Sequence, residues 1–225
     1  MPVITLIKPQ KSLRRFNVFL DGQFSFSIDK ESLIKLKLKK DQKVSLARLK
    51  DFRRQAFKAK TIESLLNLLS YRPRSQKEIA TRLKRYLEKS KTIIADLYSE
   101  SQKQNLAEEI LRFFVQKNLI NDEEFSRWWQ EQRNKFRPRG QRMLYAELLK
   151  KGIDKDIIQK VLATEEQKSQ DQNHALTLAQ KKLNTLALKH FPRPILREKL
   201  GRFLAAKGFD WPTISATLKA VLKNE

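Results

Sequence analysis

Arginine and lysine are the residues of this sequence whose number and spacing suggest chemistry. The 225 residues include 48 of these cations against 25 aspartates and glutamates, which gives a formal net charge of +23. Many cations cluster beside three prolines, Pro73, Pro138 and Pro194, and the first two stand in Arg-Pro-Arg triplets. An arginine next to a rigid proline turn is oriented to make bidentate contacts with a phosphate or a carboxylate. We therefore expect the chain to recognise anions.

The candidate binding residues lie close to one of the three prolines or in the helix predicted after it. For any single one of them, a solvated surface is the better interpretation. For the repeated set, the net charge favours binding to DNA phosphates or to an acidic protein groove. They are Arg72, Arg74, Arg82, Lys84, Arg85, Arg133, Arg137, Arg139, Arg142, Lys150, Lys151, Arg193, Arg197, Arg202 and Lys207.

Aromatic side chains stand next to several of these cations. Tyr71 and Phe136 directly precede the two Arg-Pro-Arg triplets, where we expect them to act as hydrophobic staples. Of the adjacent Trp128 and Trp129, at least one is expected to be buried, and Trp211 is expected to cap a helix pair. Stacking on bases is the alternative for these rings, since basic proteins hold single strands in this way. Core packing is the stronger interpretation.

An enzymatic function would have to start from the acidic run Asp122-Glu123-Glu124, as the metal site of a nuclease. Three adjacent residues on a helix point in different directions, whereas a two-metal site needs carboxylates that converge on ions roughly 4 Å apart. The chain has no cysteine, and its two histidines, His174 and His190, are sixteen residues apart. We therefore expect no catalysis, no metal and no cofactor.

The composition is that of a folded basic protein. Hydrophobic residues make up 40% of the chain, which is enough to build cores and argues against a disordered basic arm. No apolar stretch approaches the roughly 20 residues that span a bilayer. Residues 3–7 are too short an apolar segment for a signal peptide. We expect a cytoplasmic monomer with an anionic partner and no membrane contact.

The three prolines also mark an internal repeat. Apolar residues follow each proline after six and ten positions, as Ile79 and Leu83 do in the first copy. This spacing is typical of the start of an amphipathic helix. The second and third copies match further, through Gly152 and Gly208, each of which is expected to end one helix before the next begins. One helical module is therefore predicted to occur three times.

The first sixty residues have a different pattern, with short segments rich in β-branched and aromatic residues. Asp21-Gly22 is typical of a two-residue type I′ hairpin turn, which would place Phe19 opposite Phe24. The predicted strands are residues 3–7, 16–20 and 24–28, followed by a short helix over 32–36 capped by Asp29 and a long helix from Ser45 towards residue 71.

The predicted fold is mainly α: a tandem array of three three-helix modules, elongated or curved, after a small N-terminal domain that contains the β-hairpin. Residues 90–104 have no counterpart in the second module and are expected to form an extended or extra helical connection. The predicted domains are residues 1–60 for the N-terminal region and 61–120, 121–165 and 166–225 for modules 1, 2 and 3. Helices are predicted over residues 64–71, 76–88, 105–117, 141–150 and 155–163, over a segment starting at residue 121, and in module 3 over part of 174–224.

Three segments, in this order and spacing, resemble a known family: residues 71–79, 119–125 and 140–153. They are similar to the RecX family of recombination regulators, and residues 16–28 resemble the extra N-terminal region of its longer members. The resemblance implies a non-enzymatic bacterial protein that binds the RecA recombinase and lies along the groove of the RecA filament on single- or double-stranded DNA. It also implies modulation of the ATPase and strand-exchange activities of RecA, with inhibition as the expected sign.

The residues alone leave a second function open, a general sequence-independent DNA-binding protein without a protein partner. Binding by phosphate contacts alone weakens steeply with salt, with a slope near −0.9 per phosphate on duplex DNA. A complex with a filament should keep a salt-resistant part and should require the recombinase. On the first hypothesis, the concave side of the array spans neighbouring RecA subunits while the Arg-Pro-Arg turns approach DNA.

Overall fold

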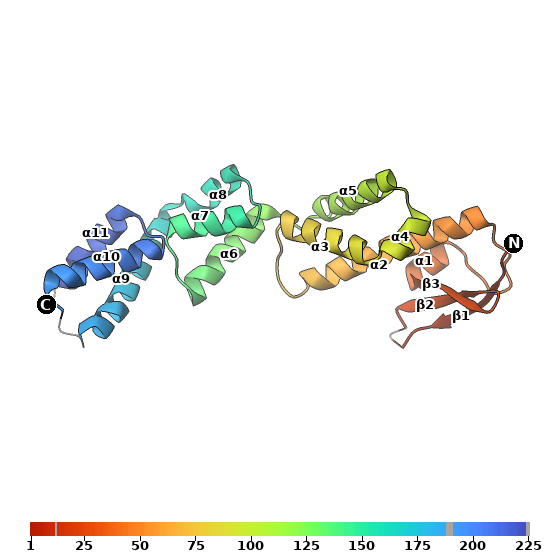
Figure 1. Cartoon of the computed structure of the whole chain (residues 1–225), viewed down its shortest axis with the longest axis horizontal. Helices are drawn as coiled ribbons and strands as arrows, with labels where there is room; N and C mark the ends of the chain where they lie inside the picture. The colour runs from red at the N-terminus through yellow and green to blue at the C-terminus, as the bar shows by residue number, and fades with distance from the viewer. Residues whose placement is uncertain (12, 188–190, 224–225) are drawn as a thin grey trace. The chain divides into compact units, whose positions relative to one another are not determined.

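The computed structural model describes residues 1–11, 13–187 and 191–223, so that His190 lies outside the described part. The described chain is mainly helical and has one three-stranded antiparallel sheet near the N-terminus (Figure 1). It divides into two compact units. Unit 1 comprises Met1–Pro73 and Ile79–Leu119, and unit 2 comprises Arg74–Glu78 and Ile120–Glu225.

The N-terminal sheet confirms the predicted hairpin. Asp21 and Gly22 have φ angles of 46° and 81°, the left-handed backbone that the predicted turn requires. Phe19 pairs with Phe24 across the turn, and their rings meet edge to face with centroids 5.9 Å apart. The three strands are β1 (Ile4–Pro9), β2 (Arg15–Leu20) and β3 (Gln23–Asp29), paired in that order.

Two helices follow the sheet, α1 (Lys30–Lys35) and α2 (Leu46–Leu69), each with its predicted cap. The backbone N–H of Ser32 donates to Asp29 at 2.8 Å, and that of Arg48 donates to the Ser45 hydroxyl at 3.3 Å. The predicted domain boundary at residues 60 and 61 lies inside α2, which is one continuous helix. Its N-terminal half contributes Phe52 and Ala56 to the core under the sheet.

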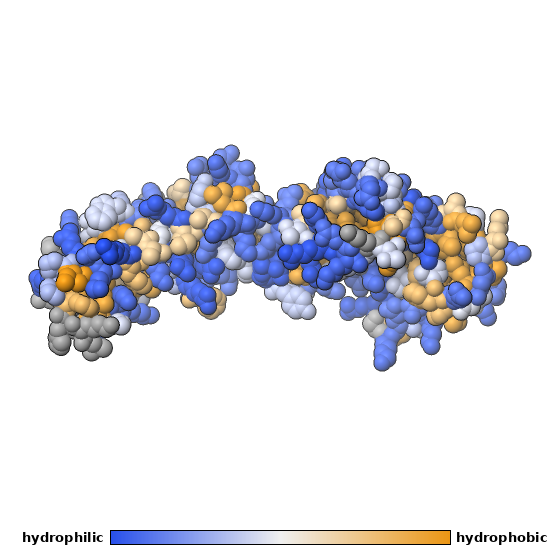
Figure 2. Space-filling view, in the orientation of Figure 1, coloured by the Kyte–Doolittle hydropathy of each residue, from blue (hydrophilic) through white to orange (hydrophobic). Residues whose placement is uncertain are grey.

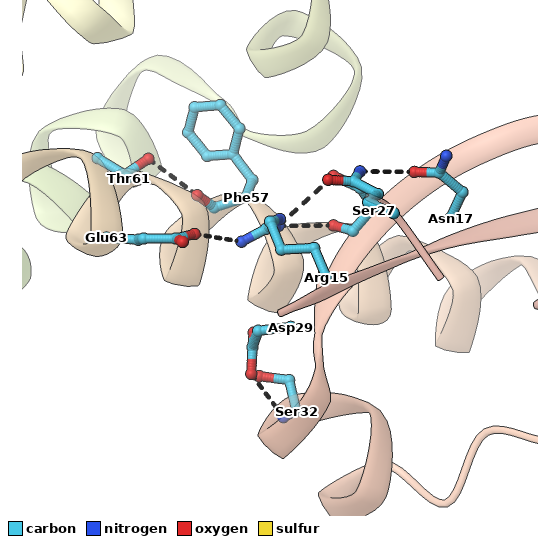
Figure 3. Close-up of polar contacts among 9 residues, drawn as sticks. Arg15, Asn17, Ser27, Asp29, Ser32, Phe57, Thr61 and Glu63 are labelled. Carbon is cyan, nitrogen blue, oxygen red and sulfur yellow. Dashed lines mark hydrogen bonds and ion pairs between the residues drawn. The ribbon is translucent and has the colours of Figure 1, made fainter. Parts of the chain in front are cut away.

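Arg15 connects this sheet to α2 (Figure 3). Its side chain is buried between the two elements, where Nη1 donates to Glu63 Oε2 at 2.7 Å and Nη2 donates to the Ser27 carbonyl oxygen at 2.9 Å. Glu63 keeps 42% of its side chain exposed, so its charge stays partly hydrated if the arginine is removed. The interaction therefore stabilises the docking of the sheet without enclosing a carboxylate.

Replacing Arg15 with methionine is expected to lower the free energy of unfolding by about 1–3 kcal/mol, because the Ser27 carbonyl loses a charged donor within the protein. Urea unfolding monitored by circular dichroism measures the change. The neighbouring Arg14 is exposed, so Arg14→Met is the matched control and should stay within about 0.5 kcal/mol of the parent. Equal stability of the two variants would contradict the role assigned to Arg15.

The remaining helices of unit 1 show what the connection over residues 90–104 is. It is helical: α4 (Lys91–Leu97) is an extra helix, and α5 (Glu100–Gln116) starts directly after it with a capping box at Ser99. α5 therefore begins five residues earlier than predicted. The middle helix of module 1, α3 (Gln76–Lys89), buries Ile79 and Leu83 as the repeat pattern predicts.

Unit 2 contains modules 2 and 3, each with a core of its own. Gly152 and Gly208 have φ angles of 81° and 90° directly after the middle helices, which confirms the two predicted C-terminal caps. One core gathers around Phe125 and Leu148, the other around Leu183 and Leu204. The helices are α6 (Asp122–Phe136), α7 (Gln141–Lys150) and α8 (Lys155–Leu162) in module 2, and α9 (Glu165–Ala187), α10 (Arg193–Ala206) and α11 (Trp211–Lys223) in module 3.

Two predictions in unit 2 are wrong. α9 begins at Glu165, before the segment 174–224 over which the helices of module 3 are predicted, because its first turns bury the polar Gln167 and Asp171 and so lack the apolar spacing of a core-facing helix. Neither Trp128 nor Trp129 is fully buried; both are partly buried against the core of module 2. None of the helices in the described ranges has the length and apolar character needed to cross a lipid bilayer.

Candidate nucleic-acid interface

The position of the cations in unit 2 depends on how module 2 contacts module 3. The first turn of α7 lies against the turn that follows α10. The backbone N–H of Gly140 donates to the Lys207 carbonyl at 3.0 Å, and that of Arg142 donates to the Gly208 carbonyl at 3.2 Å. The N–H of Gln141 donates to the Asp171 carboxylate at 3.1 Å. An aspartate from the first helix of module 3 thus caps the middle helix of module 2.

The first turn of α3, which belongs to unit 2, contacts module 2 in an equivalent way. Ser75 Oγ donates to the Lys151 carbonyl at 2.8 Å, and the backbone N–H of Gln76 donates to Asp122 Oδ1 at 2.8 Å. The same construction therefore occurs twice: a Lys-Gly turn receives the start of the preceding middle helix, and an aspartate caps that helix. The sequence pattern does not reveal Asp122 and Asp171 as capping residues of these helices, because each caps a helix about thirty or more residues away.

The acidic run has structural contacts. Asp122 caps α3, and Glu123 accepts hydrogen bonds from Arg127 and Lys160, each at 2.7 Å. These cations hold the pKa of Glu123 below its ordinary value, whereas burial raises that of Asp122. Within the described ranges, no three His, Asp or Glu side chains are grouped as a metal site would require.

Burial raises the pKa of Asp171 to about 6, the nearby Asp210 carboxylate acts in the same direction, and the hydrogen bonds from Gln167 and Gln141 oppose it. Because this pKa lies above the ordinary 3.8, the folded state binds more protons than the unfolded state between about pH 4 and pH 6. The contribution of Asp171 should therefore make unit 2 more stable as the pH falls through that window and less stable as it rises.

The measurement is the free energy of urea unfolding as a function of pH. Asp171→Asn cannot ionise and should flatten this dependence, whatever its effect on absolute stability. Asp154→Asn is the matched control, because Asp154 is an exposed cap of α8 that receives the Asp156 N–H at 2.9 Å. An unchanged slope in Asp171→Asn would show that other groups set the pH dependence.

Several predicted binding cations are engaged within the protein. Arg133 Nε donates to Glu147 at 2.7 Å, Lys151 Nζ donates to Glu78 at 2.6 Å, and both lie within 5 Å of the Trp129 ring centroid, at 4.6 and 4.8 Å. Others make weaker contacts: Arg72 donates to the Pro73 carbonyl, Arg202 pairs with Glu198, and Lys207 lies over the Phe203 ring. Arg133 therefore helps to hold module 2 together, and Lys151 joins module 2 to the first turn of α3.

The remaining predicted cations, together with the ion-paired Arg202, are exposed or partly exposed. Hydrophilic side chains cover most of the face shown in Figure 2. On α3, Arg82 and Arg85 are three residues apart and share one face, and on α10, Arg193 and Arg197 share one face at a spacing of four. Arg74 and Arg139 are partly exposed, while the exposed members of the set are Arg82, Lys84, Arg85, Arg137, Arg142, Lys150, Arg193, Arg197 and Arg202. Each module thus presents exposed cations near its proline turn.

The prediction that Tyr71 and Phe136 are hydrophobic staples is wrong. Tyr71 is 84% exposed and Phe136 is 66% exposed. The rings are exposed because the next helix starts several residues after each of them. A staple directly precedes the N-cap, but α7 has Gly140 as its N-cap, four residues after Phe136, and α3 begins at Gln76. The Arg-Pro-Arg triplets are therefore connecting turns, and the rings stand at the ends of the helices that precede them.

Models of one protein family match most of this chain. The regulatory protein RecX N-terminal domain matches residues 2–45, the second three-helix domain of RecX matches residues 121–162, and the third matches residues 169–218. The last two matches lie in modules 2 and 3.

Curated relatives and solved structures are similar to this chain over 73% to 100% of its length. Regulatory protein RecX of Bacillus subtilis (strain 168) is 32% identical over 98% of this chain and 78% of its own. Regulatory protein RecX of Clostridium perfringens (strain SM101 / Type A) is 27% identical over 100% of this chain and 99% of its own. A crystal structure of regulatory protein RecX superimposes with a TM-score of 0.68 at 22% identity and full coverage of both chains. The structure of RecX from Lactobacillus salivarius has a TM-score of 0.59 at 23% identity, over 73% of this chain and 96% of the other.

Proposed function

Because this chain belongs to the RecX family of regulatory proteins, we propose that it regulates homologous recombination and DNA repair by binding the RecA filament on DNA and inhibiting its ATPase and strand-exchange activities. The observation that carries the proposal is the similarity to regulatory protein RecX along almost the whole chain. The net charge of +23 and the exposed cations at three proline turns support an anionic partner. In this role the protein is a monomer in the cytoplasm and acts without catalysis or cofactor.

Inhibition follows from occupancy of the filament groove. In unit 2, the junction with module 3 holds the proline turn of module 2 in a fixed position, so the arginines of that turn can contact neighbouring phosphates or carboxylates together. A protein bound in this way would occupy space that an incoming DNA strand needs. Because each contact is a single ion pair near the surface, the affinity must come from many of them together.

The test is DNA-dependent ATP hydrolysis by the cognate RecA, with this protein titrated in at moderate salt and with DNA in excess. The rate of ATP hydrolysis is expected to fall when the concentration of this protein is near or below that of RecA. Excess DNA controls for simple competition for strands. If hydrolysis does not change while the protein binds DNA tightly, and if that binding disappears steeply with salt, the chain is a general DNA-binding protein and the proposal is wrong.

A further inference from the structure

Two exposed aromatic rings are not accounted for by packing. Tyr71 and Phe136 occupy the same position in modules 1 and 2, two residues before the proline of the Arg-Pro-Arg triplet. They are 84% and 66% exposed, whereas Phe114 in α5 and Phe125 in α6 are buried to 1% exposure or less. A single exposed ring is ordinary on a protein surface, so what distinguishes these two is that they recur at an equivalent place in two modules, beside cations.

The sequence around both rings is cationic. The Lys135 ammonium lies 5.4 Å from the centroid of the Phe136 ring, and the exposed Arg137 follows directly. Beside Tyr71, the Arg72 guanidinium is held at the turn by its hydrogen bond to the Pro73 carbonyl, at 2.8 Å. No aspartate or glutamate occurs in residues 64–77 or 132–143, the stretches that contain the two rings. Each ring therefore lies where an anionic ligand is attracted and no neighbouring carboxylate in the sequence opposes it.

We propose that Tyr71 and Phe136 are stacking platforms for unpaired bases of single-stranded DNA, with the arginines of the adjoining turns holding the phosphates. This rests on the proposed function only in taking DNA as a ligand. An unpaired base offers a large apolar face within reach of its own phosphate, which matches a ring beside arginine. Such stacking is tolerant of sequence, because every base has a π-face. In a duplex these faces are covered by neighbouring base pairs, so the two rings favour single strands over double strands.

Trp211 provides an internal comparison. It is also an exposed aromatic residue, at 70%, but its neighbour in the sequence is Asp210, and residues 208–218 contain no lysine or arginine. An exposed aromatic ring is therefore not always flanked by cations, as Tyr71 and Phe136 are. The replacement Trp211→Leu removes an exposed ring of similar accessibility whose immediate sequence neighbours are not lysine or arginine.

The experiment measures binding of the purified full chain, without RecA, to two fluorescent oligonucleotides at one fixed salt concentration. One is a thymidine oligonucleotide, and the other has the same length and charge but abasic sites in place of nucleotides. The double variant Tyr71→Leu/Phe136→Leu is expected to lose about 10- to 100-fold in affinity for the thymidine oligonucleotide and less than about 2-fold for the abasic one. Trp211→Leu should bind both as the parent does, and Tyr71→Phe, which keeps the ring, should retain affinity.

An equal loss on both oligonucleotides would overturn the proposal, because it would show that the rings support the fold or the cations. Unchanged DNA binding by the double variant, combined with loss of its effect on RecA, would also overturn it and would assign the rings to a protein contact. The binding assay contains no RecA. Its result therefore does not depend on whether this protein regulates RecA. Circular dichroism of each variant confirms that it is folded.

Discussion

Replacing Gly140 with alanine is expected to detach module 3 from module 2 and to lower the free energy of unfolding of unit 2 by about 2–5 kcal/mol. A Cβ atom at this position would lie 2.3 Å from the Gly208 carbonyl oxygen and 2.4 Å from the backbone nitrogen of Phe209. Both are backbone atoms, so no side chain can rotate away. The clash also breaks the hydrogen bonds from Gly140 and Arg142 that close the junction.

Gly140→Ala destabilises the protein by a steric clash and not by backbone strain. Gly140 has φ −70° and ψ 161°, which alanine adopts readily, so the isolated segment would tolerate the change. Because modules 2 and 3 have separate cores, loss of the junction should split one unfolding transition into two, as in repeat proteins. Differential scanning calorimetry measures both the shift in the transition temperature and the number of unfolding transitions.

Gly201→Ala is the matched control. Gly201 lies within α10, where a new Cβ would meet Leu218 Cδ1 at an ordinary contact distance of 3.7 Å. Alanine is the better helix former, so this variant should be more stable than the parent by about 0.5–1 kcal/mol. A single, unshifted transition in Gly140→Ala would mean that the contact between modules 2 and 3 does not contribute to stability.

The sequence predicts the elements of this fold better than their junctions. The three-stranded region, the Asp21-Gly22 turn and the caps at Gly152 and Gly208 follow from local patterns, because the residues that determine them are adjacent in the chain. Gly140 is different: its requirement comes from the Gly208 carbonyl, sixty-eight residues later, and no local pattern shows such a contact. The segment around Asp171 is misassigned for a related reason, since the polar residues at the start of α9 are buried against module 2.

The candidate site shows the same division. Clusters of cations are visible in the sequence, and the exposed positions of Arg82, Arg142 and Arg197 agree with a role in binding, which stays a prediction. That Arg133 and Lys151 are paired with Glu147 and Glu78 follows only from the tertiary structure. A glutamate four residues from an arginine can be found by helical spacing, but these partners are fourteen and seventy-three residues away.

Reversing the charge of the second proline turn, with Arg137→Glu, Arg139→Glu and Arg142→Glu combined, is expected to raise the concentration needed for half-maximal inhibition of RecA by roughly 100-fold. All three side chains are exposed or partly exposed, so the change alters the surface and not a core. Where these arginines contact phosphates, each lost contact should also reduce the salt slope of DNA binding by about 0.9 on duplex DNA. Titration of the variant into the RecA ATPase reaction measures the loss of inhibition. DNA binding at several salt concentrations measures the change in salt slope.

The control must have the same net charge, because any reduction of +23 weakens binding to DNA. Lys155→Glu, Lys181→Glu and Lys219→Glu combined change three exposed lysines of α8, α9 and α11, away from the proline turns, and produce an identical charge. For this variant, the concentration needed for half-maximal inhibition should rise by less than about 5-fold. Cations outside the interface act only through the long-range electrostatic field, which is screened beyond roughly 10 Å at moderate salt. If both variants weakened inhibition equally, the proline turns would contribute only to the overall charge, and the position assigned to them on the DNA or the filament would be wrong.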